Sequence, residues 1–143
     1  MSDSITLNDP PPRGRTILLI EDSATVRRIL RRLFETEMPD AKIIEAPDGR
    51  AALREVTRCR ADLIITDLQM PGMDGRSFIG TLRANQALRK KSVLALSSDE
   101  LSDLRRLYAG DAGILFLPKP SNPDEILRSA RALLRAAPTA FAF

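Results

Sequence analysis

The chain has 143 residues, of which 43% are hydrophobic and 29% charged, and this size and composition predict one domain with its own hydrophobic core. No apolar run approaches the roughly 18 residues of a membrane-spanning helix, and the polar N-terminus lacks a signal-peptide core, so no membrane attachment is expected. The net charge is +3 with only 4% aromatic residues, which favours a solvated surface or an acidic protein partner over direct nucleic acid binding.

Histidine is absent from the chain, and Cys59 is its single cysteine. A single cysteine cannot form an internal disulfide, which favours a reducing, cytoplasmic location. Without histidine the chain can neither carry a phosphohistidine nor supply an imidazole ligand or general base. Any metal site must therefore use oxygen ligands, which favours Mg²⁺ or Mn²⁺.

The chain divides into a leader, a folded region and a tail. Residues 1–14 contain three consecutive prolines and few apolar groups, so they are predicted to be a disordered leader. Residues 15–136 alternate five apolar runs with five helical patterns, which predicts an α/β fold with a five-stranded parallel sheet, doubly wound by helices on both faces. Residues 137–143 are expected to be a C-terminal tail.

The first strand is expected at 16–20, with Ser23 capping the helix after it. Apolar residues recur in that helix at helical spacing and are expected to form one buried stripe: Val26, Ile29, Leu30, Leu33 and Phe34. Four arginines lie between them and are expected to face outward: Arg27, Arg28, Arg31 and Arg32.

The later strands are expected at 42–45, 63–66, 93–96 and 113–117. Asp48 and Gly49 turn the chain into a helix that ends near residue 58. The proline and glycines of 70–75 predict a loop, with Asp74 capping a helix that ends near residue 84. A further helix is expected at 99–109, and Asn122 with Pro123 starts the last one, which runs to about residue 136.

Polar residues stand at the carboxyl ends of these strands or just beyond them: Glu21, Asp22, Asp67, Ser97 and Lys119. In an open parallel sheet such ends meet at one edge, where ligands bind. Three neighbouring carboxylates repel one another, and a hard divalent cation would relieve that repulsion. Asp67 can accept a phosphoryl group as an acyl phosphate, with the Lys119 ammonium and the Ser97 hydroxyl completing the pocket.

Together these residues closely resemble the receiver domain of two-component response regulators, the family that includes the chemotaxis response regulator, over about residues 15–136. The loop at 70–75, with its sequence Met-Pro-Gly-Met-Asp-Gly, matches the family's loop after the phosphoacceptor. The resemblance implies a flavodoxin-like fold, Asp67 as the phosphoacceptor, and metal binding by Glu21, Asp22, Asp67 and the backbone carbonyl of Gln69. It also implies that Ser97 and Lys119 contact the phosphoryl group, that Phe116 is the switch aromatic and that the peptide bond before Pro120 is cis.

The function implied by this resemblance is a signalling switch, not an enzyme. Asp67 would take a phosphoryl group from a sensor histidine kinase or a histidine phosphotransfer protein, and the remodelled surface would change binding to an output protein that the sequence does not identify. The first helix is the expected docking face for the donor, through Arg27, Arg28, Arg31 and Arg32, although these arginines equally fit a solvated surface beside the core.

Several alternatives remain open. The chain fits a stand-alone receiver, a phosphate sink in a relay, or the receiver part of a longer transcriptional regulator, and a phosphorylation-dependent dimer fits each of these. A Mg²⁺-dependent phosphohydrolase on a similar sheet would also use an aspartate nucleophile. Such enzymes usually have a second aspartate two residues later as general acid, where this chain has Gln69, so that class is disfavoured.

Overall fold

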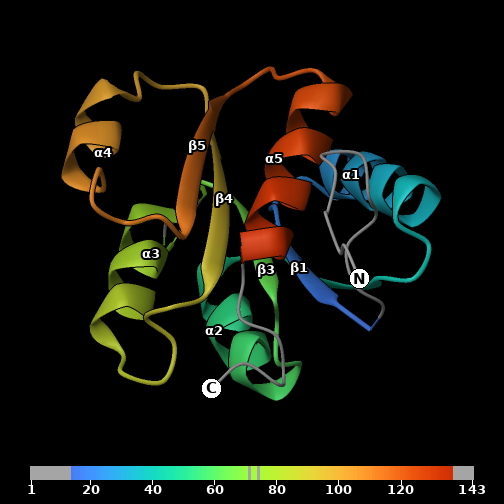
Figure 1. Ribbon diagram of the computed structural model, residues 1–143, viewed down its shortest axis with the longest axis horizontal. Helices are drawn as coiled ribbons and strands as arrows, with labels where there is room; N and C mark the ends of the chain where they lie inside the picture. The colour runs from blue at the N-terminus through green and yellow to red at the C-terminus, as the bar shows by residue number, and fades with distance from the viewer. Residues whose placement is uncertain (1–13, 71, 74, 137–143) are drawn as a thin grey trace, which may run out of the picture.

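The computed structural model describes residues 14–70, 72–73 and 75–136, so the predicted tail, nearly all of the predicted leader and the expected cap Asp74 lie outside the described residues. Five parallel strands form one sheet in the order β2-β1-β3-β4-β5 (Figure 1). The strands are β1 (Thr16–Ile20), β2 (Lys42–Ala46), β3 (Leu63–Asp67), β4 (Ser92–Ser97) and β5 (Ile114–Pro118). The helices are α1 (Ala24–Glu37), α2 (Gly49–Arg58), α3 (Gly75–Ala84), α4 (Ser102–Leu107) and α5 (Pro123–Ala136).

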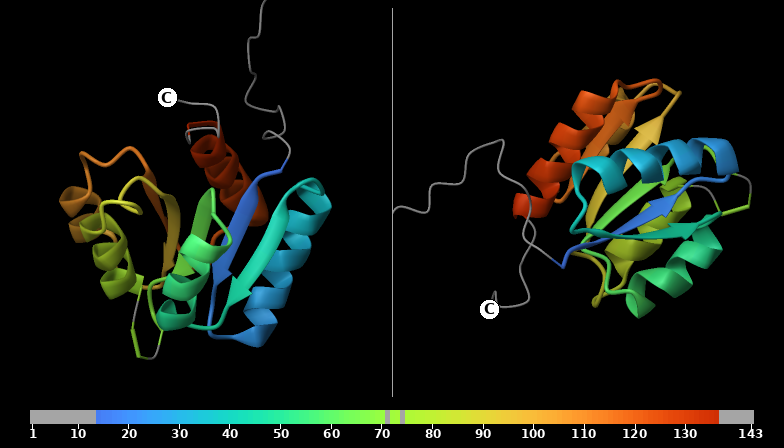
Figure 2. Two further views of the ribbon diagram at one scale, coloured as in Figure 1. Left: turned by 90° about the horizontal axis from the view of Figure 1, so that it is seen from below. Right: turned by 90° about the vertical axis from the view of Figure 1, so that its right-hand side faces the viewer.

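Helices cover both faces of the sheet, as the alternating pattern predicts. The three central strands β1, β3 and β4 are buried along their whole length, because a parallel sheet between two helical layers exposes neither face. One core cluster joins α1 and α5 to the sheet through residues such as Phe34 and Leu133, and the other joins α2, α3 and α4 to its opposite face (Figure 2). The doubly wound α/β fold is therefore confirmed.

Polar caps begin the helices where the sequence places them. The Ser23 hydroxyl accepts a hydrogen bond from the Val26 amide at 3.3 Å, and the Asn122 side chain accepts one from the Glu125 amide at 2.8 Å. Each cap satisfies an amide that the first helical turn leaves without a partner. Both caps stand just after a strand and therefore help to fix the loops at its carboxyl end.

The buried stripe predicted for α1 is partly wrong. Leu30 and Phe34 are buried, and Val26 and Leu33 are half-buried, but Ile29 is 63% exposed. Ile29 lies at the edge of the stripe and lines an open groove between α1 and the start of α5, so no neighbouring element covers it.

The predicted outward orientation holds for only two of the four arginines of α1. Arg28 and Arg32 are exposed, whereas Arg27 and Arg31 are half-buried because both pair with Glu45 of β2. Of these four arginines, only Arg28 and Arg32 therefore present an exposed guanidinium group to a partner.

Helix α4 has six residues, fewer than the helix expected at 99–109. Leu101, the residue just before the helix, has no side chain that could cap it. Asp99, which lies before Leu101, makes its hydrogen bonds outside the helix. The Asp99 amide donates to the Ser97 hydroxyl at 3.0 Å, and the Asp99 carboxylate accepts from the Gln69 side chain at 3.1 Å. These contacts hold residues 98–100 as a loop.

Candidate functional site

The acidic residues meet at the carboxyl end of the sheet. Because β1 pairs with β3 in the register Ile20 to Thr66, Glu21 and Asp22 lie beside Asp67. One carboxylate oxygen of each residue lies within 4.8 Å of those of the other two. Glu21 and Asp67 are 3% and 5% exposed, whereas Asp22 is exposed. This set consists of oxygen donors only, which suits a hard divalent cation.

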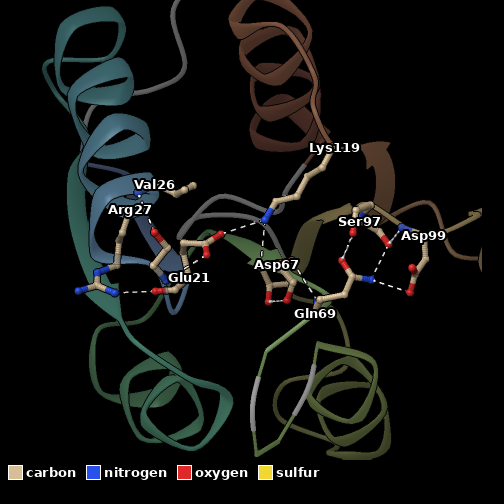
Figure 3. A network of polar contacts seen from close by, with 11 residues as sticks. Glu21, Val26, Arg27, Asp67, Gln69, Ser97, Asp99 and Lys119 are labelled. Carbon is tan, nitrogen blue, oxygen red and sulfur yellow. Dashed lines mark hydrogen bonds and ion pairs between the residues drawn. The ribbon is translucent and has the colours of Figure 1, made fainter.

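Lys119 extends over this cluster from beyond β5 (Figure 3). Its Nζ lies 3.0 Å from Asp67 Oδ2 and 3.2 Å from Glu21 Oε2. Its backbone amide donates to the Ser97 carbonyl at 2.7 Å, which fixes the start of the segment that carries the side chain. The Lys119–Pro120 peptide bond is cis. Pro118, which lacks an amide donor, lies on β5 at the edge of the sheet, where its loss of a ladder bond is tolerated.

Burial and charge shift two pKa values in this cluster. Burial raises the pKa of Glu21 above its ordinary value of 4.5, and the Asp67 charge adds to this, although the Ser23 amide and Lys119 act in the opposite direction. Burial lowers the pKa of Lys119, but its hydrogen bonds and charge interactions with Asp67 and Glu21 outweigh burial, so that its pKa is raised overall. Lys119 is therefore firmly cationic at neutral pH and acts as the counter-ion of two buried carboxyl groups.

Asp67 is held from two sides. Its Oδ2 faces Lys119, and its Oδ1 accepts a hydrogen bond from the Gln69 amide at 3.0 Å. Behind it, Gly75 allows α3 to approach closely, since a Cβ at that position would lie 2.6 Å from the Asp67 carbonyl oxygen. The carboxylate is thus positioned at the rim of the sheet with both oxygens engaged.

The contacts of the Gln69 side chain are a feature that the sequence interpretation did not predict. Its Nε2 donates to Ser97 Oγ at 2.8 Å and to Asp99 Oδ2 at 3.1 Å, and its Oε1 accepts from the Ser98 amide at 3.1 Å (Figure 3). Ser97 itself is fully buried at the end of β4. The structure therefore brings Ser97 close to the Asp67 segment through Gln69.

Phe116 lies on β5 with its ring turned into the core and is 7% exposed. Its ring centroid is 5.8 Å from that of Tyr108, and its carbonyl accepts a hydrogen bond from Arg105 Nη2 at 3.1 Å. Both partners stand on α4 or directly after it, so Phe116 joins that helix to the edge of the sheet. Tyr108 was not singled out from the sequence. Its position at the end of the helix that precedes β5 could have predicted a contact with Phe116 of that strand.

An apolar groove of about 440 Å³ lies beside the acidic cluster, between α1 and the segment that leads into α5. Its wall includes Ile29 and Leu33 from α1, Ile126 from α5, and Lys119 and Pro120. The groove therefore extends from the lysine of the acidic cluster along the exposed side of α1. In the part of the chain that the structure describes, no helix is long and apolar enough to cross a membrane.

Comparison with known families agrees with this geometry. The family described as the response regulator receiver domain matches residues 17–131. The transcriptional regulatory protein ResD of Bacillus subtilis is 33% identical over 121 residues, which cover 85% of this chain and 48% of the relative. A protein-glutamate methylesterase/protein-glutamine glutaminase of a Nocardioides species is 34% identical over 120 residues, covering 81% of this chain and 32% of the relative.

Solved structures show the same fold. The chemotaxis protein CheY4 of Vibrio cholerae superposes with a TM-score of 0.72 at 26% identity, over 83% of this chain and 98% of that one. The chain spans about a third to a half of the length of the two curated relatives, and nearly the whole of the chemotaxis protein. The similarity to the two longer relatives therefore concerns only a part of each.

Proposed function

Because the chain belongs to the family of response regulator receiver domains, it is a phosphoacceptor signalling domain, and we propose that Asp67 is the residue that takes the phosphoryl group. The observation that carries this proposal is the position of the Asp67 carboxylate, buried at the end of β3 between Lys119 and two further acidic residues. The donor would be a phosphohistidine on a sensor histidine kinase or a histidine phosphotransfer protein, since the chain has no histidine of its own.

In the transfer step an Asp67 carboxylate oxygen attacks the phosphorus of the phosphohistidine. The new P–O bond forms as the P–N bond breaks, and the electron pair of the broken bond returns to the imidazole of the donor, which takes up a proton there. Lys119, which already faces Asp67 Oδ2, is in place to pair with a phosphoryl oxygen, and the Ser97 hydroxyl is expected to donate a hydrogen bond to another. Water later hydrolyses the acyl phosphate and restores the carboxylate.

The metal of this proposal is Mg²⁺ or Mn²⁺. Glu21, Asp22, Asp67 and the Gln69 carbonyl would hold it, and the all-oxygen carboxylate cluster supports that choice. When bound, a divalent cation neutralises charge on the phosphoryl oxygens and draws the carboxylates together. Glu21 has one methylene more than the aspartate often found at its position, which suits a ligand that acts through a metal-bound water.

The response to phosphorylation would pass through Ser97 and Phe116 to the surface formed by α4, β5 and α5. Phe116 supports this route because it contacts Tyr108 and Arg105 of the α4 segment. The output is proposed to be a changed affinity for another protein, with no catalysis on a separate substrate and no direct contact with nucleic acid or membrane. A phosphate sink in a relay, a receiver within a longer transcriptional regulator and a phosphorylation-dependent dimer remain alternatives for the whole protein. The lone Cys59 supports a cytoplasmic location.

The phosphodonor is proposed to dock on α1 and the adjoining groove. Arg28 and Arg32 are exposed there, and the groove offers apolar surface next to Lys119. Arg27 and Arg31 of the predicted docking set would contribute less, because Arg27 is already paired with Glu45 and Arg31 with Glu45 and Glu35. Charge reversal at Arg28 and Arg32 should slow phosphotransfer from a kinase but leave labelling by acetyl phosphate unchanged. Arg54→Glu, on the exposed side of α2, is the matched control, and equal slowing in that variant would contradict docking on α1.

Intact mass spectrometry with acetyl phosphate and Mg²⁺ tests the central assignment. The wild-type chain should gain one phosphoryl group, and Asp67→Asn should gain none because an amide oxygen is a poor nucleophile. Asp99→Asn is the control, since it removes a carboxylate from the same rim without touching the acidic cluster. Undiminished labelling of Asp67→Asn would overturn the assignment.

A further inference from the structure

The side-chain amide of Gln69 connects two loops at the carboxyl end of the sheet. It stands in the segment after β3 and makes four hydrogen bonds to three consecutive residues at the end of β4 and just beyond it: Ser97, Ser98 and Asp99. Both amide protons are donated, and Oε1 accepts from the amide and the hydroxyl of Ser98. The hydrogen-bonding capacity of this side chain is therefore fully used between the two loops.

The chemistry of the partners fixes the orientation of this amide. Reversing it would point the NH₂ group at the Ser98 N–H donor and the carbonyl oxygen at the Asp99 carboxylate, so two attractive contacts would become repulsive. On the other side, Ser97 Oγ accepts from both Gln69 Nε2 and the Asp99 amide, which occupies both of its lone pairs. The hydrogen bonds between Gln69 and the loop therefore allow only one orientation of the Gln69 side-chain amide.

The backbone of the same residue contacts the phosphoacceptor, since the Gln69 amide donates to Asp67 Oδ1 at 3.0 Å. While Asp67 is a carboxylate, this hydrogen bond is charge-assisted and about twice as strong as one between neutral groups. Attachment of a phosphoryl group turns one carboxylate oxygen into an anhydride oxygen and the other into a neutral carbonyl oxygen. The hydrogen bond from the Gln69 backbone amide to Asp67 is then weakened, whichever carboxylate oxygen carries the phosphoryl group.

Residues 98–100 of the loop held by Gln69 have little other anchorage, whereas the next residue, Leu101, is buried in the core. Ser98, Asp99 and Glu100 are exposed, and α4 starts without a side-chain cap. The hydrogen bond from the Ser102 amide to Glu100 Oε1, at 2.7 Å, joins the loop only to the first residue of α4. Across to β5, Arg105 holds the Phe116 carbonyl from inside α4. Release of Gln69 would therefore free residues 98–100, up to the buried Leu101.

We propose that Gln69 is a latch: its side chain holds the β4–α4 loop in the unphosphorylated position, and phosphorylation of Asp67 releases it. The release part rests on the proposed function of Asp67, whereas the holding part does not. The latch stabilises the unswitched state, so the free energy by which phosphorylation favours the switched state is reduced by the free energy needed to release the latch. A chain without the latch should reach the switched arrangement more readily.

The test compares the wild type with Gln69→Met, which keeps the length of the side chain and the backbone carbonyl but cannot hydrogen bond in this way. Amide hydrogen exchange at residues 98–100, measured without any phosphoryl donor, should accelerate about two- to tenfold, the effect of losing one net hydrogen bond. Beryllofluoride with Mg²⁺, used as the probe for an acyl phosphate, should bind tighter by a similar factor. Gln69→Glu should behave likewise, because it cannot donate to Ser97 and repels Asp99. Gln86→Met, at an exposed glutamine between α3 and β4, is the control and should match the wild type.

Unchanged exchange in both Gln69 variants would overturn the latch. Faster exchange with unchanged beryllofluoride affinity would leave a tether without coupling to Asp67 and would overturn the release step. Failure of the wild type to accept a phosphoryl group from acetyl phosphate would refute the function proposed for Asp67, and hydrogen exchange would still decide whether Gln69 holds the loop. The two proposals therefore fail by different measurements.

Discussion

The rim of the sheet has a charged half and a neutral half. At the ends of β1 and β3 two buried carboxyl groups share the cation of Lys119, whereas at the end of β4 the fully buried Ser97 is held by the Gln69 amide. Removal of one member of the charged half leaves a buried charge without its partner, while the neutral half loses only ordinary hydrogen bonds. The charged half is therefore suited to binding a metal and a phosphoryl group, and the neutral half to a movement of low cost.

The largest effect is expected from Lys119→Met. Without this cation, Glu21 and Asp67 repel each other, and the free energy of unfolding should fall by about 2 kcal/mol in the absence of divalent ions. Millimolar Mg²⁺ should then stabilise the variant more than the wild type, because in the variant Mg²⁺ no longer competes with the Lys119 ammonium for the same carboxylate oxygens. Denaturant unfolding with and without Mg²⁺ measures both quantities.

Lys91→Met is the matched control for this experiment. The Lys91 Nζ donates to the Ala61 carbonyl at 2.9 Å, away from the acidic cluster. Its removal should leave the stabilisation by Mg²⁺ at the wild-type value. Equal responses of the two variants to Mg²⁺ would show that the charged half does not depend on Lys119.

A smaller effect is expected from Ser97→Ala in the neutral half. The Gln69 Nε2 and the Asp99 amide lose their shared acceptor, which should cost about 1 kcal/mol of unfolding free energy. In contrast to the lysine variant, the stabilisation by Mg²⁺ should equal that of the wild type. A changed response to Mg²⁺ would mean that the two halves are not separable in the unphosphorylated chain.

The two halves also differ in how well the sequence predicts them. The charged half follows from polar residues placed at the ends of apolar runs, because the register of a parallel sheet brings such ends together. The neutral half depends on the direction of one flexible side chain, Gln69, which no periodicity encodes. For the same reason the helix expected at 99–109 is longer than the observed helix, Ser102–Leu107. Asp99 does not start the helix, because it is hydrogen-bonded to Gln69 and Ser97.

The errors on α1 have a similar origin. The helical period correctly identifies Leu30 and Phe34 as buried, but the period alone cannot tell how wide the covered stripe is. Ile29 is exposed because α1 and α5 leave a groove between them, and Arg27 is half-buried because Glu45 of β2 lies within reach. Both outcomes depend on the placement of a second element, which the pattern within one helix does not contain.

The smallest effect concerns the pH dependence of the charged half, because the influences on Glu21 oppose one another. Its pKa is raised above 4.5 in the folded chain, so the fold holds this proton more tightly than the unfolded chain does. The stability that Glu21 contributes is therefore present below pH 4.5 and is lost as the pH rises through the folded pKa. Relative to Glu21→Gln, the wild type should lose unfolding free energy as the pH rises above 4.5 in the absence of divalent ions.

Glu100, in the exposed loop that follows β4, offers a control of opposite sign. The hydrogen bond from the Ser102 amide lowers the pKa of Glu100 below 4.5, so its contribution to stability is present above that pH and is lost as the pH falls through the folded pKa. Relative to Glu100→Gln, the wild type should therefore gain stability as the pH rises toward about 4.5 and stay level above it, where it loses stability relative to Glu21→Gln. If the two difference curves have the same slope, a shared change of the whole chain is responsible, and burial of Glu21 beside Asp67 is not.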